Sequence, residues 1–344
     1  MLKKFMLSET KIYEIDSKQM HKTYNSWPDL ATESFQNSFQ KCEIKDIDHI
    51  VFAGMGGSGT IGDVISSVLS KTNLHTTVVK GYMLPRDIDK NTLVVATSIT
   101  GNTDETLAVS KLAINSPANF ISFSSGGLLE NLSIKNNQQH FHIEMNHSPR
   151  ASLIGYLYST LNVLEDLLPI KKYEMQESIE KLHNLKKIID TNNLTNSNPS
   201  LNLSYWIKNI PLIYYPWGLQ SAAIRFKNSM QENSKNHMII EDIIEACHNG
   251  IVAWEKKSDI QPVLLQGKED NPKTVERWKL IKEMLNDKGI KYYEIFSESG
   301  NILSKLICMI YLLDFSSLYH SVINNIDPTP VLPIEQMKKK LSSS

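Results

Sequence analysis

The chain has 344 residues, of which 41% are apolar and 21% are charged, a composition typical of a globular protein with room for two domains. Its formal net charge of -1 gives no electrostatic reason to expect nucleic acid or a membrane as a partner. We find no apolar run of membrane-spanning length, no signal-peptide core and no cysteine spacing suited to a metal, and therefore expect a cytoplasmic protein.

Residues 1–45 predict a helical lead-in that packs onto the domain that follows it. Asp16 or Ser17 is placed to cap a helix there. Large side chains are the expected anchors of this segment, and they are Met20, Tyr24, Trp27 and Leu30.

A glycine-rich turn organises the next stretch of the chain. Ile50–Ala53 is a short apolar run that predicts a buried parallel strand, and helical periodicity begins at Ile61. Gly54–Gly59 is then a tight turn between a strand and a helix. Such a turn leaves N–H groups free at the positive end of a helix dipole, where they attract an anion, most often phosphate.

Several interpretations of this turn compete. The spacing Gly54-x-Gly56-x-x-Gly59 matches a dinucleotide fingerprint, but the second strand runs into Lys80 where that site needs an acidic residue. A nucleoside-triphosphate loop needs a lysine after the glycines, and none follows them. A monophosphate site remains, with Ser58 as the hydroxyl donor. The glycines are also consistent with a turn that only lets helix and strand pack closely.

A second turn, rich in hydroxyl groups, follows the strand expected over 92–97. It contains Ser98, Thr100 and Thr103 and leads into a helix expected from about Leu107 to Ala113. Taken singly, Thr103 is an ordinary helix N-cap. Two such turns on successive parallel strands meet at one edge of a sheet, so together they favour a phosphate pocket.

Short apolar runs alternate with helical segments along the rest of the chain, which predicts an α/β fold with a doubly wound parallel sheet over 46–190. The stretch 191–200 is rich in turn formers and is the expected linker. A second α/β domain with terminal helices is expected over 201–344. The further strands are expected near 76–79, 119–122, 140–143, 210–215, 238–241, 262–265 and 291–295.

The second half carries side chains that are able to transfer protons. Glu232 ends an amphipathic helix, and Arg225 lies seven residues earlier on roughly the same face. A carboxylate near a sheet edge can act as a general base, but a solvated helix end is the plainer interpretation. His248 is open to the same two interpretations, as a proton-transfer group or as an ordinary loop histidine.

In combination, these motifs resemble the sugar isomerase (SIS) domain, through Gly-Met-Gly-Gly-Ser at 54–58 and Ser-x-Thr-Gly-Asn-Thr-x-Glu-Thr at 98–106. The chain resembles more narrowly the bifunctional phosphoglucose/phosphomannose isomerases found mainly in archaea. The resemblance spans nearly the whole chain, including Trp27-Pro28 near its start and the segment 314–319 late on. It implies two flavodoxin-like SIS domains in tandem.

The resemblance also implies the catalytic residues. Glu232 would move a proton between C1 and C2 of an open-chain sugar phosphate. His248 would help to open the sugar ring and would be supplied by the neighbouring subunit of a homodimer. A lysine near the C-terminus assists, and the pattern Ile-x-x-Met-Lys-x-x-Leu puts it at Lys338, with Lys339 and Lys340 as neighbouring registers.

The substrate contacts carry over in the same way. Arg150 would face the substrate, and Thr329 would admit the mannose epimer. Ile99 departs from the tyrosine common in the family, and a threonine replaces the usual serine at the next position. The implied phosphate contacts are Gly57, Ser58, Ser98, Thr100 and Thr103.

The implied reaction interconverts glucose 6-phosphate and mannose 6-phosphate with fructose 6-phosphate through a planar cis-enediolate. It needs no cofactor, and no metal either, provided that cations such as Arg150 offset the enediolate charge. Sugar phosphates are then the expected small-molecule partners.

Other classes of protein stay open. A non-catalytic sugar-phosphate sensor would keep the hydroxyl groups but dispense with Glu232, His248 and Lys338. Another SIS enzyme, such as an amino-sugar phosphate or phosphoheptose isomerase, would lack the His248-Asn249 and Asp327-Pro328 pairs. A nicotinamide-dependent oxidoreductase is least favoured, because the ribose-binding acid is missing.

Overall fold

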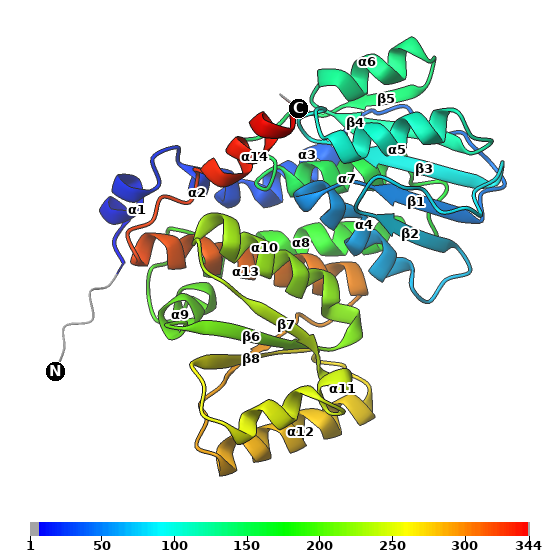
Figure 1. Ribbon diagram of the computed structural model, residues 1–344. Coiled ribbons are helices and arrows are strands. Elements are labelled where there is room, and N and C mark those ends of the chain that lie inside the picture. Colours follow the sequence, from blue (N-terminus) through cyan, green and yellow to red (C-terminus); the bar gives the residue numbers. More distant parts are fainter. Residues whose placement is uncertain (1–6, 343–344) are drawn as a thin grey trace.

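Two parallel β-sheets form the framework of the computed structural model, which describes residues 7–342 (Figure 1). The first sheet has five strands in the order β2-β1-β3-β4-β5, and the second has four in the order β7-β6-β8-β9. All paired strands are parallel. The predicted α/β fold with two doubly wound parallel sheets is confirmed.

The central strands are buried on both faces, which explains why they read as unbroken apolar runs in the sequence. Every expected strand is present, with ends shifted by one or two residues at most. The strands are β1 (His49–Ala53), β2 (His75–Val79), β3 (Thr92–Thr97), β4 (Asn119–Ser124), β5 (Gln139–His142), β6 (Ile210–Tyr215), β7 (Ile239–Asp242), β8 (Ile260–Gln266) and β9 (Tyr293–Phe296).

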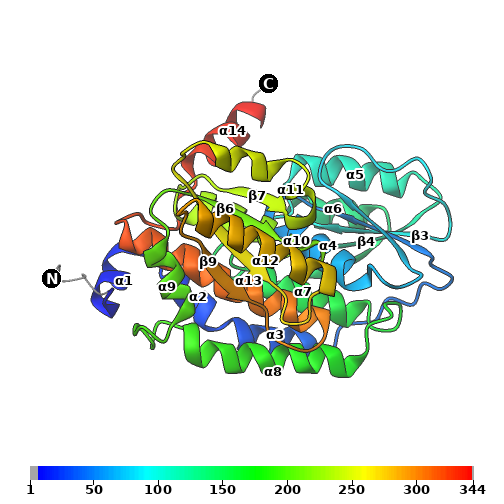
Figure 2. The same cartoon turned by 90° about the horizontal axis from the view of Figure 1, so that it is seen from below.

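Helices cover both sheets, and α10 and α13 lie between them (Figures 1 and 2). The α-helices are α1 (Glu9–Ile15), α2 (Met20–Asn25), α3 (Trp27–Gln36), α4 (Gly56–Leu69), α5 (Asp104–Ile114), α6 (Gly127–Lys135), α7 (Leu153–Val163), α8 (Lys172–Ile189), α9 (Pro199–Trp206), α10 (Gln220–Asn233), α11 (Ile243–Ala246), α12 (Pro272–Asp287), α13 (Ile302–Ile323) and α14 (Leu332–Ser342). Residues 7–342 also contain two 3-10 helices, η1 (Trp217–Leu219) and η2 (Gly250–Glu255).

The helix α13 is the centre of the core and packs against α4, α8, α9 and α10. The sequence analysis found no uninterrupted apolar run of membrane-spanning length. Within residues 7–342, α13 could cross a bilayer by length and composition alone, but 94% of its most apolar window is buried inside the protein, as in a core helix. The helix α10 also packs on α4, so the α-helices that follow β1 and β6, the first strands of the two sheets, contact each other.

The lead-in packs closely on this core. Tyr24 and Trp27 are fully buried, and the Trp27 indole N–H donates to the carbonyl oxygen of Ala151 at 2.8 Å. Asp16 caps α2, because its carboxylate accepts from the N–H groups of Met20 and His21 at 2.9 and 2.8 Å. The same turn contacts the segment that follows α13, because the Ser17 hydroxyl donates to Asp327 at 2.6 Å.

The strand order of the first sheet changes direction between β1 and β3. In open parallel sheets, ligands bind outside the carboxyl ends of the strands at such a point. The turns after β1 and β3 are the two turns that the sequence analysis singled out, so they lie side by side at this edge.

Candidate active site

The turn after β1 presents the free end of a helix. Gly56 adopts a positive φ of 53°, which a residue without a side chain adopts at little cost. The leading N–H groups of a helix have no intrahelical partner, and within residues 7–342 the N-cap side chain of α4 makes no capping hydrogen bond to them. Ser58 is buried there, and its hydroxyl accepts from the N–H of Ile99 in the neighbouring turn at 3.3 Å. That hydrogen bond joins the two turns.

The turn after β3 is built in the same way. Thr103 stands at the N-cap position of α5, but its side chain makes no capping hydrogen bond. Its hydroxyl instead accepts from Ser98 at 2.9 Å. The Thr100 hydroxyl accepts from the N–H of Asn102 at 3.4 Å. Two uncapped helix starts and a cluster of hydroxyl groups therefore share one edge of the sheet, an arrangement suited to a phosphate group.

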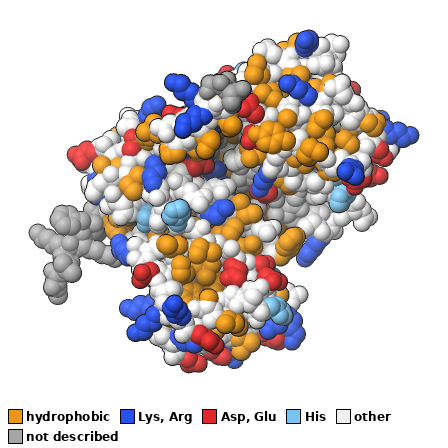
Figure 3. Space-filling model, in the orientation of Figure 1, with side chains coloured by type: hydrophobic (Ala, Val, Ile, Leu, Met, Phe, Trp, Pro, Cys, Tyr) orange, Lys and Arg blue, Asp and Glu red, His pale blue; other side chains and the backbone are white. Residues whose placement is uncertain are grey.

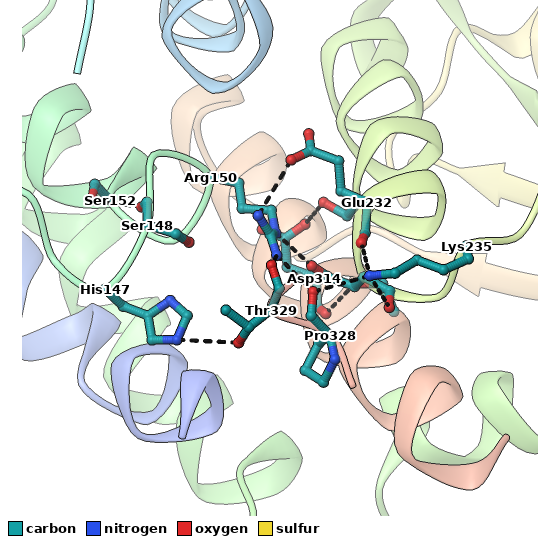
Figure 4. A network of polar contacts seen from close by, with 12 residues as sticks. His147, Ser148, Arg150, Ser152, Glu232, Lys235, Asp314, Pro328 and Thr329 are labelled. Atoms are coloured by element: carbon teal, nitrogen blue, oxygen red, sulfur yellow. Dashed lines mark hydrogen bonds and ion pairs between the residues drawn. The ribbon is translucent and has the colours of Figure 1, made fainter. Parts of the chain in front are cut away.

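Arg150 lies at the centre of the polar network in Figure 4. Its side chain is only 4% exposed. Its Nε donates to Asn233 at 2.7 Å, and its Nη2 donates to the carbonyl oxygens of Pro328 and Thr329 at 2.6 and 3.0 Å. Its Nη1 lies 3.4 Å from the carboxylate of Glu232. Three partners thus fix the guanidinium, and its remaining nitrogen faces a carboxylate.

A second buried arginine supports this arrangement. Arg225 forms an ion pair with Asp314 of α13 at 2.6 Å, and the Ser229 hydroxyl donates to the same carboxylate at 2.5 Å. Burial is the largest single effect on the pKa of Arg225 and would lower it, but the charge of Asp314, together with the hydrogen bond to Asp314 and the charges of Tyr24 and Glu232, raises that pKa overall. Arg225 also donates to the carbonyl oxygen of Arg150 at 2.7 Å. The pair therefore ties α10, α13 and the segment that carries Arg150 together.

The glycine-rich turn reaches this network through Gly57. A Cβ atom at Gly57 would lie 3.3 Å from the carbonyl oxygen of Pro149 and 3.5 Å from the Cα of Arg150. The backbones are in close contact, and a side chain at this position would separate them. The predicted phosphate site and the Arg150–Glu232 pair are thus adjacent parts of one site.

Glu232 is 26% exposed and borders a cavity of about 690 Å³, a volume in the range of small-molecule sites. Lys235 lines the same cavity, and its ammonium donates to the Glu232 carbonyl oxygen at 2.6 Å and to that of Asp327 at 3.2 Å. Burial, followed by the charge of Arg150, lowers the pKa of Lys235. The lysine joins the end of α10 to the segment that contains Thr329.

The helix α14 separates this cavity from a second one of about 800 Å³, which Asn102, Thr103 and Lys338 line. Pro333 and Ile334, at the start of α14, border both cavities. Apolar side chains gather on this face of the molecule, over α14 (Figure 3). The exposed ones on α14 are Leu332, Ile334, Met337 and Leu341.

The structure brings most of the predicted site residues together. Ser58, Ser98 and Thr103 meet at the two turns, and Arg150 contacts both Glu232 and Thr329. Lys338 borders the neighbouring cavity together with Thr103. His248 is the exception. It follows α11, its side chain is exposed, and within residues 7–342 no hydrogen bond or ion pair joins it to the other predicted site residues.

The sequence analysis assigned no role in the site to four residues of the network, namely His147, Asn233, Lys235 and Asp314. Asn233 follows Glu232 directly and Lys235 lies three residues after it, so their closeness in the sequence was a signal. Asp314 is an isolated acid in an apolar helix, which commonly marks a buried ion pair. His147 had no comparable signal. Among the described residues, no group of three or more His, Cys, Asp or Glu side chains is arranged to hold a metal ion.

Comparisons with known proteins agree with this geometry. Residues 196–341 match the family model described as the C-terminal SIS domain of bacterial phospho-glucose isomerase. A hypothetical protein from Thermus thermophilus has a similar structure, with a TM-score of 0.72 over 97% of this chain and 94% of that chain. At 12% identity, that likeness concerns the fold alone.

Two relatives are similar along nearly their full length. A bifunctional phosphoglucose/phosphomannose isomerase from Caldicellulosiruptor bescii is 31% identical over 326 residues, which cover 91% of this chain and 95% of the relative. A protein of the same name from Aquifex aeolicus is 30% identical over 323 residues, which cover 90% and 97%. The chain therefore belongs to the bifunctional phosphoglucose/phosphomannose isomerase family.

Proposed function

We propose that the protein interconverts both glucose 6-phosphate and mannose 6-phosphate with fructose 6-phosphate. The observation that carries the proposal is the contact between Arg150 and Glu232 beside the two uncapped turns. This arrangement places a partly exposed carboxylate and a fixed cation next to the turns at which a phosphate group would bind. The names of the relatives support the same activity.

In this proposal the phosphate group binds at the turns after β1 and β3. Ser58, Ser98, Thr100 and Thr103 contribute hydroxyl groups, and Gly57 contributes a backbone N–H. Support comes from the hydrogen bonds that already join these turns and from the missing side-chain caps of both helices. The phosphate anchors the substrate, and the sugar carbons extend toward Glu232.

Glu232 then acts as the base. It removes the proton from C2 of the open-chain aldose, which gives a planar cis-enediolate. A hydroxyl proton passes from O2 to O1, and Glu232 returns its proton to C1 to form the ketose. Because the planar centre has lost its configuration, rotation about C2–C3 allows either epimer to connect to fructose 6-phosphate. Arg150 offsets the negative charge that develops on the enediolate oxygens. Thr329 lies beside Arg150 and admits the mannose epimer.

His248 opens the sugar ring by proton transfer, and it comes from the second subunit of a homodimer. Support comes from its exposed position and from the absence of side-chain contacts to the rest of the site within residues 7–342. Lys338 assists from α14, whose exposed apolar face lies at the border of the site. The chemistry proposed here requires neither a metal nor a cofactor, and we expect the enzyme to act in the cytoplasm.

The test is to incubate purified protein with fructose 6-phosphate and excess EDTA and to assay glucose 6-phosphate and mannose 6-phosphate separately. The proposal predicts both products at rates that EDTA does not change. Glucose 6-phosphate alone would restrict the activity to phosphoglucose isomerase. Binding of fructose 6-phosphate without either product would identify a sensor. If the protein neither binds fructose 6-phosphate nor forms a product, the proposal is wrong.

A further inference from the structure

His147 occupies an unusual place beside the site. It lies between β5 and α7 with a φ of 64°, a left-handed conformation that residues other than glycine adopt rarely. The hydroxyl of Ser152 stabilises this turn from both sides, because it accepts from the N–H of Asn146 at 2.9 Å and lies 2.9 Å from the carbonyl oxygen of Ser148. The backbone is therefore held in a conformation that directs the imidazole toward the segment after α13 (Figure 4).

The imidazole meets Thr329. Its Nε2 lies 3.5 Å from the Thr329 hydroxyl, and the described residues offer this hydroxyl no other hydrogen-bond partner. The backbone of Thr329 is fixed separately, since its N–H donates to Asp327 at 2.9 Å and its carbonyl oxygen accepts from Arg150 at 3.0 Å. These backbone contacts do not determine the direction of the Thr329 hydroxyl. Among the described residues, His147 is the group that lies within hydrogen-bonding distance of that hydroxyl.

The surroundings of the imidazole suit that task. Burial is the main cause that lowers the pKa of His147, and the charges of Arg150 and Lys18 act in the same direction, while Asp16 opposes them. The ring is therefore neutral near pH 7, with one nitrogen that donates and one that accepts. The lead-in supplies two of the charges that act on the ring, those of Asp16 and Lys18, and the intervening Ser17 donates to Asp327 at 2.6 Å.

We propose that His147 is a positioning residue that orients the Thr329 hydroxyl and thereby sets the ratio of mannose to glucose isomerisation. This inference rests on the proposed function, in which Thr329 admits the mannose epimer. The two aldoses differ only in the direction of the hydroxyl group at C2. A protein hydroxyl that is already oriented loses less freedom when it meets that group, so its fixed direction favours one epimer.

The experiment compares two variants at this position. His147→Asn preserves the backbone, because asparagine tolerates left-handed conformations, but its side chain is too short to reach Thr329. His147→Gln carries an amide that extends about as far as Nε2. In His147→Asn we expect kcat/KM for mannose 6-phosphate to fall about fivefold relative to that for glucose 6-phosphate, the size of effect that one neutral hydrogen bond produces. In His147→Gln we expect the ratio of the two kcat/KM values to recover most of the way to its wild-type value.

A Thr329→Val background tests whether the effect passes through the threonine. We expect His147→Asn to change the epimer ratio no further in that background. Equal losses of both activities in the asparagine variant, without recovery in the glutamine variant, would overturn the inference, as would an equal ratio change in the valine background. Glucose isomerisation and thermal unfolding of the same preparations report whether each variant is folded. If the wild-type protein forms neither aldose phosphate, the proposed function itself is wrong. That result is distinct from a failure of the inference about His147, in which the wild-type protein is active.

Discussion

Arg150 and Glu232 face each other across 3.4 Å, although they come from opposite halves of the chain. Arg150 follows the first sheet, and Glu232 lies at the end of α10, the α-helix that follows the first strand of the second sheet. Their contact depends on the packing of α10 on α4 and on α13, which brings the two halves together. The proposed chemistry is therefore a property of the interface between the halves, because neither half alone holds both groups.

The phosphate turn is tested by comparing two serines of one helix. Ser58→Ala removes a hydroxyl at the uncapped start of α4, and we expect it to raise KM for fructose 6-phosphate about tenfold, as the loss of a hydrogen bond to a charged group does. Ser67→Ala is the control, because the Ser67 hydroxyl donates to the Asp63 carbonyl oxygen within the same helix. Steady-state kinetics of both variants are the measurement. Equal KM values for the two would show that this turn does not bind the phosphate.

The buried ion pair between Arg225 and Asp314 is tested by Asp314→Asn. The change leaves a buried guanidinium without a charged partner, so we expect the free energy of unfolding to fall by about 3–5 kcal/mol. We also expect isomerisation to slow, since Arg225 holds the Arg150 backbone.

Urea unfolding is the measurement for this variant, with Glu276→Gln as the control. Glu276 pairs with Lys273 on the surface at 2.9 Å, and loss of an exposed pair has little effect on stability. If both variants lose the same small amount of stability, the Arg225–Asp314 pair is not a structural anchor.

The pH dependence of stability is tested at His320 of α13. Burial, helped by the charge of Lys208, lowers the pKa of His320 to about 4, and its Nδ1 lies 2.7 Å from the Ser234 hydroxyl. In the unfolded chain, a histidine titrates near 6.5. Between these two values the unfolded chain binds the proton and the folded chain does not, so stability falls as the pH drops from about 6.5 toward 4.

The measurement compares urea unfolding of the wild-type protein and of His320→Gln at pH 7.5 and 5.5. We expect the difference in unfolding free energy between the two to shrink by about 1 kcal/mol at the lower pH, because only the wild type carries the titrating ring. His237→Gln, at an exposed position, is the control. A constant difference would mean that His320 titrates normally in the folded protein.

The shared site is tested by mixing two inactive proteins. If His248 serves the partner's site, a heterodimer of Glu232→Gln and His248→Ala subunits has one site with both residues intact. After random reassembly, we expect about one quarter of wild-type activity to return. Activity that stays absent, with heterodimers verified by mass spectrometry, would place His248 outside the partner's site.

The strands and the two turns were predictable because their signals are local. A buried parallel strand reads as an apolar run, and a glycine turn followed by helical periodicity marks a helix start. The start of the helix α12 also carries local signals, since Pro272 occupies its first turn and Asn271 caps it. The helix α9 was not expected, because Asn198 caps it from within a stretch rich in turn formers.

The network around Arg150 was predicted only in part, because its contacts join residues far apart in the chain. Asp314 lies 89 residues from Arg225, and His147 lies 182 residues from Thr329. No periodicity or spacing links such pairs before the fold brings them together. Glu232 and Arg150 were identified through the resemblance of their motifs to a known family, whereas periodicity and spacing alone favoured a solvated helix end for Glu232.

The most direct test of the central claim is Glu232→Gln, assayed with fructose 6-phosphate for both aldose phosphates and by calorimetry for binding. The amide keeps the shape of the side chain but is not a base, so we predict that both rates fall together by about 10²–10⁴-fold while fructose 6-phosphate still binds. Glu276→Gln, far from the network on α12, is the matched control. Retention of either activity at the wild-type level would contradict the account, because one carboxylate is proposed to serve both epimers.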